Sequence, residues 1–136
     1  MKIVVDTNIF VSAFIVNNGN PAQILRHIDR IKITTSQEIL DETEDVLHRK
    51  HIQIKYKITG KQINNYIKSL RENCTLIQPT KIVKAVKDDP DDDIVLAIAK
   101  HAKAKYIISG DPHLTKLKVY EGIKILTPAQ FLIILK

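Results

Sequence analysis

Apolar and polar residues follow two alternating patterns along the chain. Short apolar runs predict buried strands at Lys2–Val5, Lys32–Thr35, Cys74–Pro79, Lys105–Ser109 and Gly122–Leu126. Segments with helical periodicity, or with long apolar runs, predict helices at about Ile9–Val16, Asn20–Arg30, Ser36–Leu47, Gly60–Leu70, Ile94–Ala102 and Thr127–Leu135. Because strands that alternate with amphipathic helices pair in parallel, we expect an α/β fold with a mainly parallel sheet and helices on both faces.

Capping residues sharpen the predicted helix starts. Asn20 is expected to cap a helix that has Pro21 at its first position and Gln23 as the partner in a capping box. Ser36 is expected to cap the next helix. The buried helix that follows the acidic block should begin at Asp91 or Asp92.

Length and cysteine content predict a single domain in a reducing compartment. The 136 residues suit one hydrophobic core, so residues 1–136 are expected to form one domain. Cys74 is the lone cysteine and permits no internal disulfide; its apolar neighbours predict a buried, inert thiol. With neither a secretory signal nor an apolar run long enough for a membrane span, a cytoplasmic protein with no membrane partner is expected.

Charge is unevenly distributed. The net charge is +6, yet five acids fall within Asp88–Asp93, so the rest of the chain is more basic than the total suggests. His48–Lys57 is the densest basic run, and it is either an RNA-contacting arm or a solvated helix end. Concentrated acids in a basic protein resemble a metal site within a polyanion-binding surface, but a charge run considered alone favours a solvated loop.

Two aspartates follow predicted strands. Asp6 comes directly after the first strand, and Asp111 follows Ser109 and Gly110 at the end of a later one. In open α/β sheets, sites form beyond the carboxyl ends of the strands, so we expect both carboxylates at one edge. Asp6 can also cap the following helix, unless Thr7 or Asn8 supplies that cap.

The acidic block supplies a third candidate. The helix dipole favours one or two acids in a first turn, but clustered carboxylates repel one another unless a divalent cation is bound. Asp92 is the first choice as a ligand, and Asp89 and Asp93 are neighbours that could assist it. Glu42 borders the apolar stripe of its helix, and the pattern leaves open whether it is a ligand or a surface residue.

Oxygen ligands alone favour Mg²⁺ or Mn²⁺ over Zn²⁺. The five histidines have no zinc-like spacing, and the chain lacks the glycine-rich motifs of nucleotide-binding loops. Carboxylates that hold one or two such ions in a basic protein fit phosphodiester hydrolysis, because the ion acidifies a water and neutralises charge on the phosphate.

Separate motifs resemble those of PIN domains, in the same order along nearly the whole chain. "VVDTNIFVSAFI" is similar to their opening motif, "SQEILDETEDVL" to their second acidic motif, and "DPDDDIVLAIAKHAKAKYIISGD" to their closing half. The resemblance is strongest to proteins described as toxin components of toxin–antitoxin systems, relatives of VapC.

This resemblance implies a three-layer α/β/α sandwich and a Mg²⁺- or Mn²⁺-dependent endoribonuclease that cleaves single-stranded RNA. The implied partners are RNA, an antitoxin protein and a second copy of the chain in a homodimer. The implied catalytic residues are Asp6, Glu42, Asp92 and Asp111, of which Asp6, Asp92 and Asp111 bind metal. The implied supporting residues are Asn8, Asp89, Asp93 and Ser109.

Other functions remain open at this point. A PIN-type fold also serves in RNA processing, or as a non-catalytic RNA-binding or regulatory module. A receiver-like phosphoacceptor domain also gathers acids at a sheet edge. It fits less well, because it needs its aspartate after a middle strand and a distal lysine, whereas Asp6 follows the first strand and Lys105 begins one.

Overall fold

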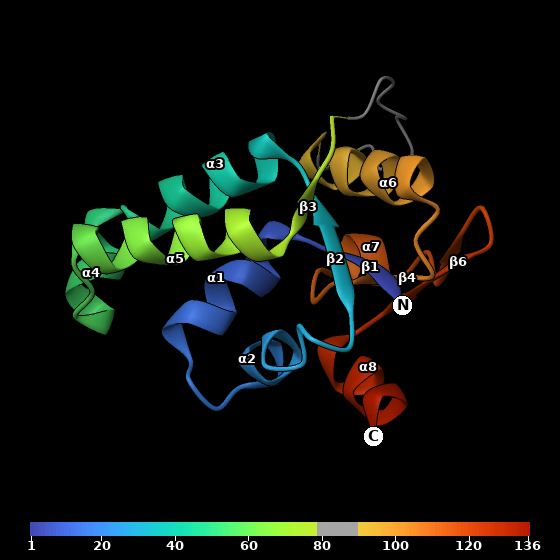
Figure 1. The fold of residues 1–136 in the computed structure, drawn as a ribbon, viewed down its shortest axis with the longest axis horizontal. Coiled ribbons are helices and arrows are strands. Elements are labelled where there is room, and N and C mark those ends of the chain that lie inside the picture. The colour runs from blue at the N-terminus through green and yellow to red at the C-terminus, as the bar shows by residue number, and fades with distance from the viewer. Residues whose placement is uncertain (79–89) are drawn as a thin grey trace.

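A mainly parallel sheet forms the centre of the protein (Figure 1). A computed structural model describes residues 1–78 and 90–136, with the backbone alone for 90–93. In this part of the chain the strands are β1 Lys2–Val5, β2 Lys32–Thr35, β3 Thr75–Leu76, β4 Tyr106–Ile108, β5 Val119–Tyr120 and β6 Ile123–Leu126. Their order across the sheet is β3-β2-β1-β4-β6-β5, and each neighbouring pair is parallel except β5 with β6.

Helices cover both faces of this sheet. They are α1 Thr7–Ile15, α2 Asn20–Leu25, α3 Gln37–Leu47, α4 Lys50–Tyr56, α5 Gly60–Asn73, α6 Pro90–Ala102, α7 Pro112–Thr115 and α8 Pro128–Leu135. Helix α6 packs against β1, β2 and β4, while α1 packs against α2 and α3. Helices α3 and α5 lie side by side, with α4 at one end (Figure 1). The predicted α/β architecture is confirmed. No described helix is long and apolar enough to cross a membrane.

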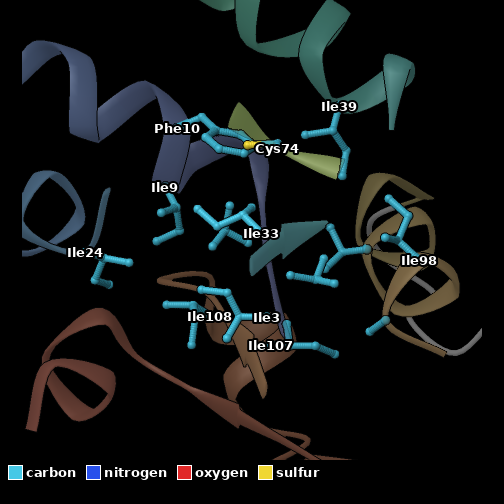
Figure 2. Close-up of a cluster of buried hydrophobic side chains, with 14 of the residues drawn as sticks. Ile3, Ile9, Phe10, Ile24, Ile33, Ile39, Cys74, Ile98, Ile107 and Ile108 are labelled. Atoms are coloured by element: carbon cyan, nitrogen blue, oxygen red, sulfur yellow. The ribbon is translucent and has the colours of Figure 1, made fainter. Parts of the chain in front are cut away.

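The core is built from isoleucines on both faces of the strands. Figure 2 shows Ile9 and Ile24 on one side of the central strands and Ile98 of α6 on the other. Ile107 and Ile108 on β4 are fully buried between these layers. Burying each such side chain stabilises the folded state by roughly 1.5–3 kcal/mol. Because these strands are buried on both faces, their sequences are continuous apolar runs.

Cys74 is buried at the end of α5, as predicted. Burial raises the pKa of its thiol to about 11, because the apolar surroundings disfavour the thiolate. At neutral pH this thiol is therefore protonated and a poor nucleophile.

Most predicted helix starts are confirmed. Ser36 caps α3, its hydroxyl accepting from the Ile39 amide at 3.3 Å. Thr59 and Thr127 cap α5 and α8, each within a complete capping box. Helix α6 begins at Pro90, a residue or two before the expected start.

The prediction for α2 was wrong at both ends. Gly19, not Asn20, is the N-cap, since the Gly19 carbonyl accepts the first helical hydrogen bond from Gln23 at 3.1 Å. The predicted capping box is absent, and the Gln23 side chain donates to the Asn18 carbonyl instead. The helix ends at Leu25, and the chain then continues in tight turns up to residue 30.

The sequence pattern missed some short elements. Helix α4 occupies most of the basic run His48–Lys57 and ends where Lys57 adopts a left-handed conformation, with φ 53°. Helix α7 and strand β5 were also missed, because each has only a few residues. The predicted strand at Cys74–Pro79 is confirmed only at Thr75–Leu76, and Pro79 lies outside the described residues.

Candidate functional site

Strands β1 and β4 are neighbours at the point where the chain stops adding strands on one side of the sheet and begins to add them on the other. From β1 the chain moves to β2 and β3 on one side, and β4 begins the part on the other side. Ligands bind in open α/β sheets at such a switch point, beyond the carboxyl ends of the strands. Asp6 follows β1 at this edge, and its amide donates to the Ile108 carbonyl of β4 at 3.2 Å.

Asp6 is almost completely buried, with 4% of its surface exposed. One carboxylate oxygen accepts from the Ile9 amide at 3.0 Å, and the other accepts from the Ser109 hydroxyl. Asp6 is therefore the N-cap of α1, and the alternative that Thr7 or Asn8 supplies the cap is wrong. One oxygen therefore caps α1, and the other links the end of β1 to the end of β4.

The pKa of Asp6 is raised to about 6, mainly by burial and to a smaller extent by the nearby Asp111 carboxylate. Hydrogen bonds from Ser109 and from the Ile9 and Asn8 amides act in the opposite direction, since they stabilise the charged form. The effect of burial on the pKa of Asp6 is larger than the effect of these hydrogen bonds. The site thus holds a carboxylate whose negative charge is only partly compensated by the described residues around it.

Asp111 is linked to Asp6 through Ser109. The Ser109 hydroxyl donates to Asp6 and accepts from the Asp111 amide at 2.9 Å, so one buried side chain holds both acidic residues. The Asp111 carboxylate accepts from the His113 amide at 2.9 Å and caps the short helix α7. Its side chain is 17% exposed. It can therefore be reached from solvent, while Asp6 lies deeper.

His113 is a residue that the sequence pattern did not single out. Its imidazole Nδ1 lies 3.7 Å from the Asp111 carboxylate, which makes an ion pair whenever the ring is protonated. A local feature of the sequence indicates His113. It comes two residues after the capping Asp111, and this spacing places its ring beside the cap.

The other predicted site residues are placed less completely. Glu42 lies on α3 and is half-buried, and Asn8 is exposed in the first turn of α1. Asp92 and Asp93 belong to the first turn of α6, but their side chains lie outside the described residues, as does Asp89. Among the described side chains, no three acids, histidines or cysteines converge to hold a metal ion. Asp6, Ser109 and Asp111 are brought together.

A comparison with known protein families shows to which family this chain belongs. A sequence model described as the PIN domain matches residues 2–113, which includes the switch point from Asp6 to Asp111. The chain belongs to the PIN domain family.

This PIN domain resembles a known protein in sequence and a solved structure in fold. The uncharacterized protein MJ1680 of Methanocaldococcus jannaschii is 32% identical over 120 residues, covering 87% of this chain and 76% of that protein. A chain of the crystal structure of VapBC2 from Rickettsia felis, bound to a DNA fragment from their promoter, superposes with a TM-score of 0.62. That match covers 93% of this chain and 98% of the other at 14% identity, so it shows a shared, VapC-like fold.

PIN domains are generally nucleases and typically use divalent metal ions. The donors that this PIN domain brings together are compatible with such an ion. Asp6 and Asp111 offer hard carboxylate oxygens, which suit Mg²⁺ and Mn²⁺. The raised pKa of Asp6 shows that its negative charge is under-compensated, and a bound cation would relieve this cost.

Proposed function

We propose that this PIN domain is a Mg²⁺- or Mn²⁺-dependent endoribonuclease that cleaves single-stranded RNA. The observation that carries the proposal is the Ser109 bridge, which fixes Asp6 and Asp111 together at the switch point of the sheet. Paired carboxylates in a protein of net charge +6 suit the hydrolysis of a polyanion.

Within this proposal, Asp6, Asp92 and Asp111 hold the divalent cation. A cation in that position supplies charge neutralisation at the phosphate and an acidified water. Glu42 on α3 either is a further ligand of that cation or would orient the attacking water, and no side chain acts as a covalent nucleophile. Ser109 keeps the Asp6 carboxylate in place.

Three further residues have supporting roles in the proposal. Asn8 stands next to the site at the exposed start of α1. Asp89 and Asp93 add negative charge beside Asp92 and thereby strengthen cation binding. Surface lysines and arginines hold the phosphate backbone, so affinity for RNA should fall as salt is raised.

Cleavage assays test this function directly. Single-stranded RNA should be cut in the presence of MnCl₂ or MgCl₂ and left intact in EDTA, while single-stranded DNA of the same sequence should resist. Protein heated and recooled with the same buffer serves as the control for contaminating ribonuclease. RNA cleavage that continues at the same rate in EDTA would refute the metal dependence, and equal cleavage of DNA would refute the RNA preference.

We further propose that the protein is the toxin of a toxin–antitoxin pair, acts in the cytoplasm and forms a homodimer. Its VapC-like fold, shared with a chain of the VapBC2 complex, supports an antitoxin partner. Expression of the chain alone should then arrest bacterial growth, and the Asp6→Asn variant should not. Growth arrest of equal strength by that variant would separate any toxicity from the proposed nuclease site.

A further inference from the structure

A cavity of about 570 Å³ opens at the C-terminal end of α1, between that helix and the turn that joins α4 to α5. Figure 1 shows these helices grouped together on one side of the molecule. The cavity is separate from the switch-point site, because Asp6, Ser109 and Asp111 are not among its described lining residues. Its volume lies within the roughly 300–1,000 Å³ that is typical of small-ligand sites.

Aromatic rings form one wall of this cavity. Phe14 and Tyr66 stack with ring centroids 4.5 Å apart and an interplanar angle of 30°. The Tyr66 hydroxyl donates to the Phe10 carbonyl at 2.6 Å, which fixes the ring against α1 before any ligand binds. Tyr56 adds a third ring, and the Lys55 ammonium lies 5.3 Å from its centroid. Such a wall offers flat apolar surface held in place in advance.

Side-chain amides, a lysine and two isoleucines line the remainder. Asn17 and Asn65 each carry hydrogen-bond donors and an acceptor, which can match the polar edge of a base, while Gln62 already accepts from the Thr59 amide and offers its donors. Lys57 contributes a positive charge at the rim, and none of the described lining residues is acidic. The neighbouring helix α4 adds Lys50 and Lys55, and none of its residues is buried. The cavity therefore combines stacking surface, amide groups and positive charge.

We propose that this cavity binds a nucleobase of the single-stranded RNA, at a position other than the cleaved bond. The base stacks on the wall of Phe14 and Tyr66, Asn65 bonds to its polar edge, and Lys57 contacts an adjacent phosphate. The inference rests on the proposed ribonuclease function and adds a specificity subsite to it. A peptide segment of a partner protein is the competing occupant, but an apolar peptide would leave the amide groups without partners.

RNA binding measured in EDTA tests this inference without cleavage. The probe is a fluorescein-labelled single-stranded RNA of mixed sequence, followed by fluorescence anisotropy. Phe14→Leu keeps an apolar side chain but removes the ring, and we expect affinity to fall about tenfold. Asn65→Ala alters an exposed residue with little risk to folding, and we expect a loss of about threefold. An RNA of the same length without bases should bind the wild type and both variants equally weakly.

Two lysines provide a matched pair for the charge contribution. Lys57 and Lys103 are both exposed and both left-handed, with φ 53° and 54°, but Lys103 lies outside this cavity. Lys57→Gln should weaken RNA binding and lower its salt dependence, whereas Lys103→Gln should change both less. Equal effects of the two substitutions would assign the contribution of Lys57 to net charge alone and overturn its role here.

Each outcome distinguishes the inference from the proposed function. If the wild type cleaves RNA with Mn²⁺ but Phe14→Leu and Asn65→Ala bind RNA normally, the inference fails and the proposed function stands. The same holds if these variants lose a protein partner and keep their RNA affinity. If the wild type cuts no RNA yet the variants weaken RNA binding as expected, the cavity assignment stands and the nuclease assignment fails.

Discussion

At the scale of single residues, Asp6 combines roles that compete with one another. As a helix cap it accepts a hydrogen bond, and as a member of the site it keeps a negative charge in a buried position. Its raised pKa, about 6, means that the folded protein binds a proton at Asp6 more tightly than the unfolded chain does. In the absence of metal, ionised Asp6 therefore destabilises the fold at neutral pH.

Replacing Asp6 by Asn should stabilise the metal-free protein. Asn is as good a cap as Asp, and its NH2 group can donate to the Ser109 hydroxyl as a protonated Asp6 would, so the charge is the main loss. The shift from 3.8 to about 6 corresponds to at most about 3 kcal/mol, and we expect a gain of 1–3 kcal/mol at pH 8 in EDTA. The gain should shrink as the pH falls through 6 and vanish near pH 4, where the wild-type carboxyl is protonated. Urea denaturation across this pH range measures it.

An exposed acid provides the control for this prediction. Asp45→Asn on α3 makes the same chemical change at an exposed position and should leave the free energy of unfolding nearly unchanged at every pH. If Asp6→Asn were destabilising at pH 8, or if its effect did not vary with pH, the assignment of a buried, under-compensated charge would be wrong.

The candidate site could be predicted from the sequence only in part. Asp6 and Asp111 each follow a strand, so their common edge followed from the pattern. The Ser109 bond to Asp6 joins residues 103 positions apart, and no local pattern indicates such a contact. His113 was missed because its role depends on the cap that Asp111 makes. The roles of Glu42 and Asp92 remain predictions.

At the scale of elements, capping chemistry explains both the correct and the missed helices. Ser36, Thr59 and Thr127 carry the side-chain oxygens that favour a helix start, and each begins one. Gly19 caps α2 through its backbone alone, so the more conspicuous Asn20 misled the prediction. Lys57 ends α4 in a left-handed conformation that glycine or asparagine usually adopts, so the sequence carried no stop signal there.

Tyr66 joins α5 to α1, and this link is open to a direct test. Tyr66→Phe keeps the stacked ring but removes the hydroxyl that bonds to the Phe10 carbonyl. We expect the free energy of unfolding to fall by about 1 kcal/mol. Urea denaturation followed by circular dichroism measures the change.

Tyr106→Phe is the matched control, since its ring also packs in the core and its hydroxyl makes no hydrogen bond to the described residues. A loss in Tyr66→Phe no larger than in Tyr106→Phe would contradict a stabilising link between the two helices.

At the scale of the whole molecule, strand order creates the site. The alternation of strands and helices predicted parallel pairing, and the structure confirms it. The order β3-β2-β1-β4-β6-β5 did not follow from the pattern, because it depends on which apolar faces pack together in three dimensions. That order makes β1 and β4 neighbours, and so it brings Asp6 beside Asp111. The antiparallel edge strand β5 is too short to leave a periodic signal.

The measurement that tests the central claim most directly is the single-turnover rate of RNA cleavage with Mn²⁺ in three variants of equal charge. Asp6→Asn and Asp111→Asn should each slow cleavage roughly a hundredfold or more, because each removes a carboxylate from the switch-point site. Asp45→Asn should cleave at the wild-type rate. Because Asp6→Asn is expected to be more stable than the wild type without metal, its loss of activity would not reflect unfolding. Wild-type cleavage by Asp6→Asn or Asp111→Asn would contradict the account.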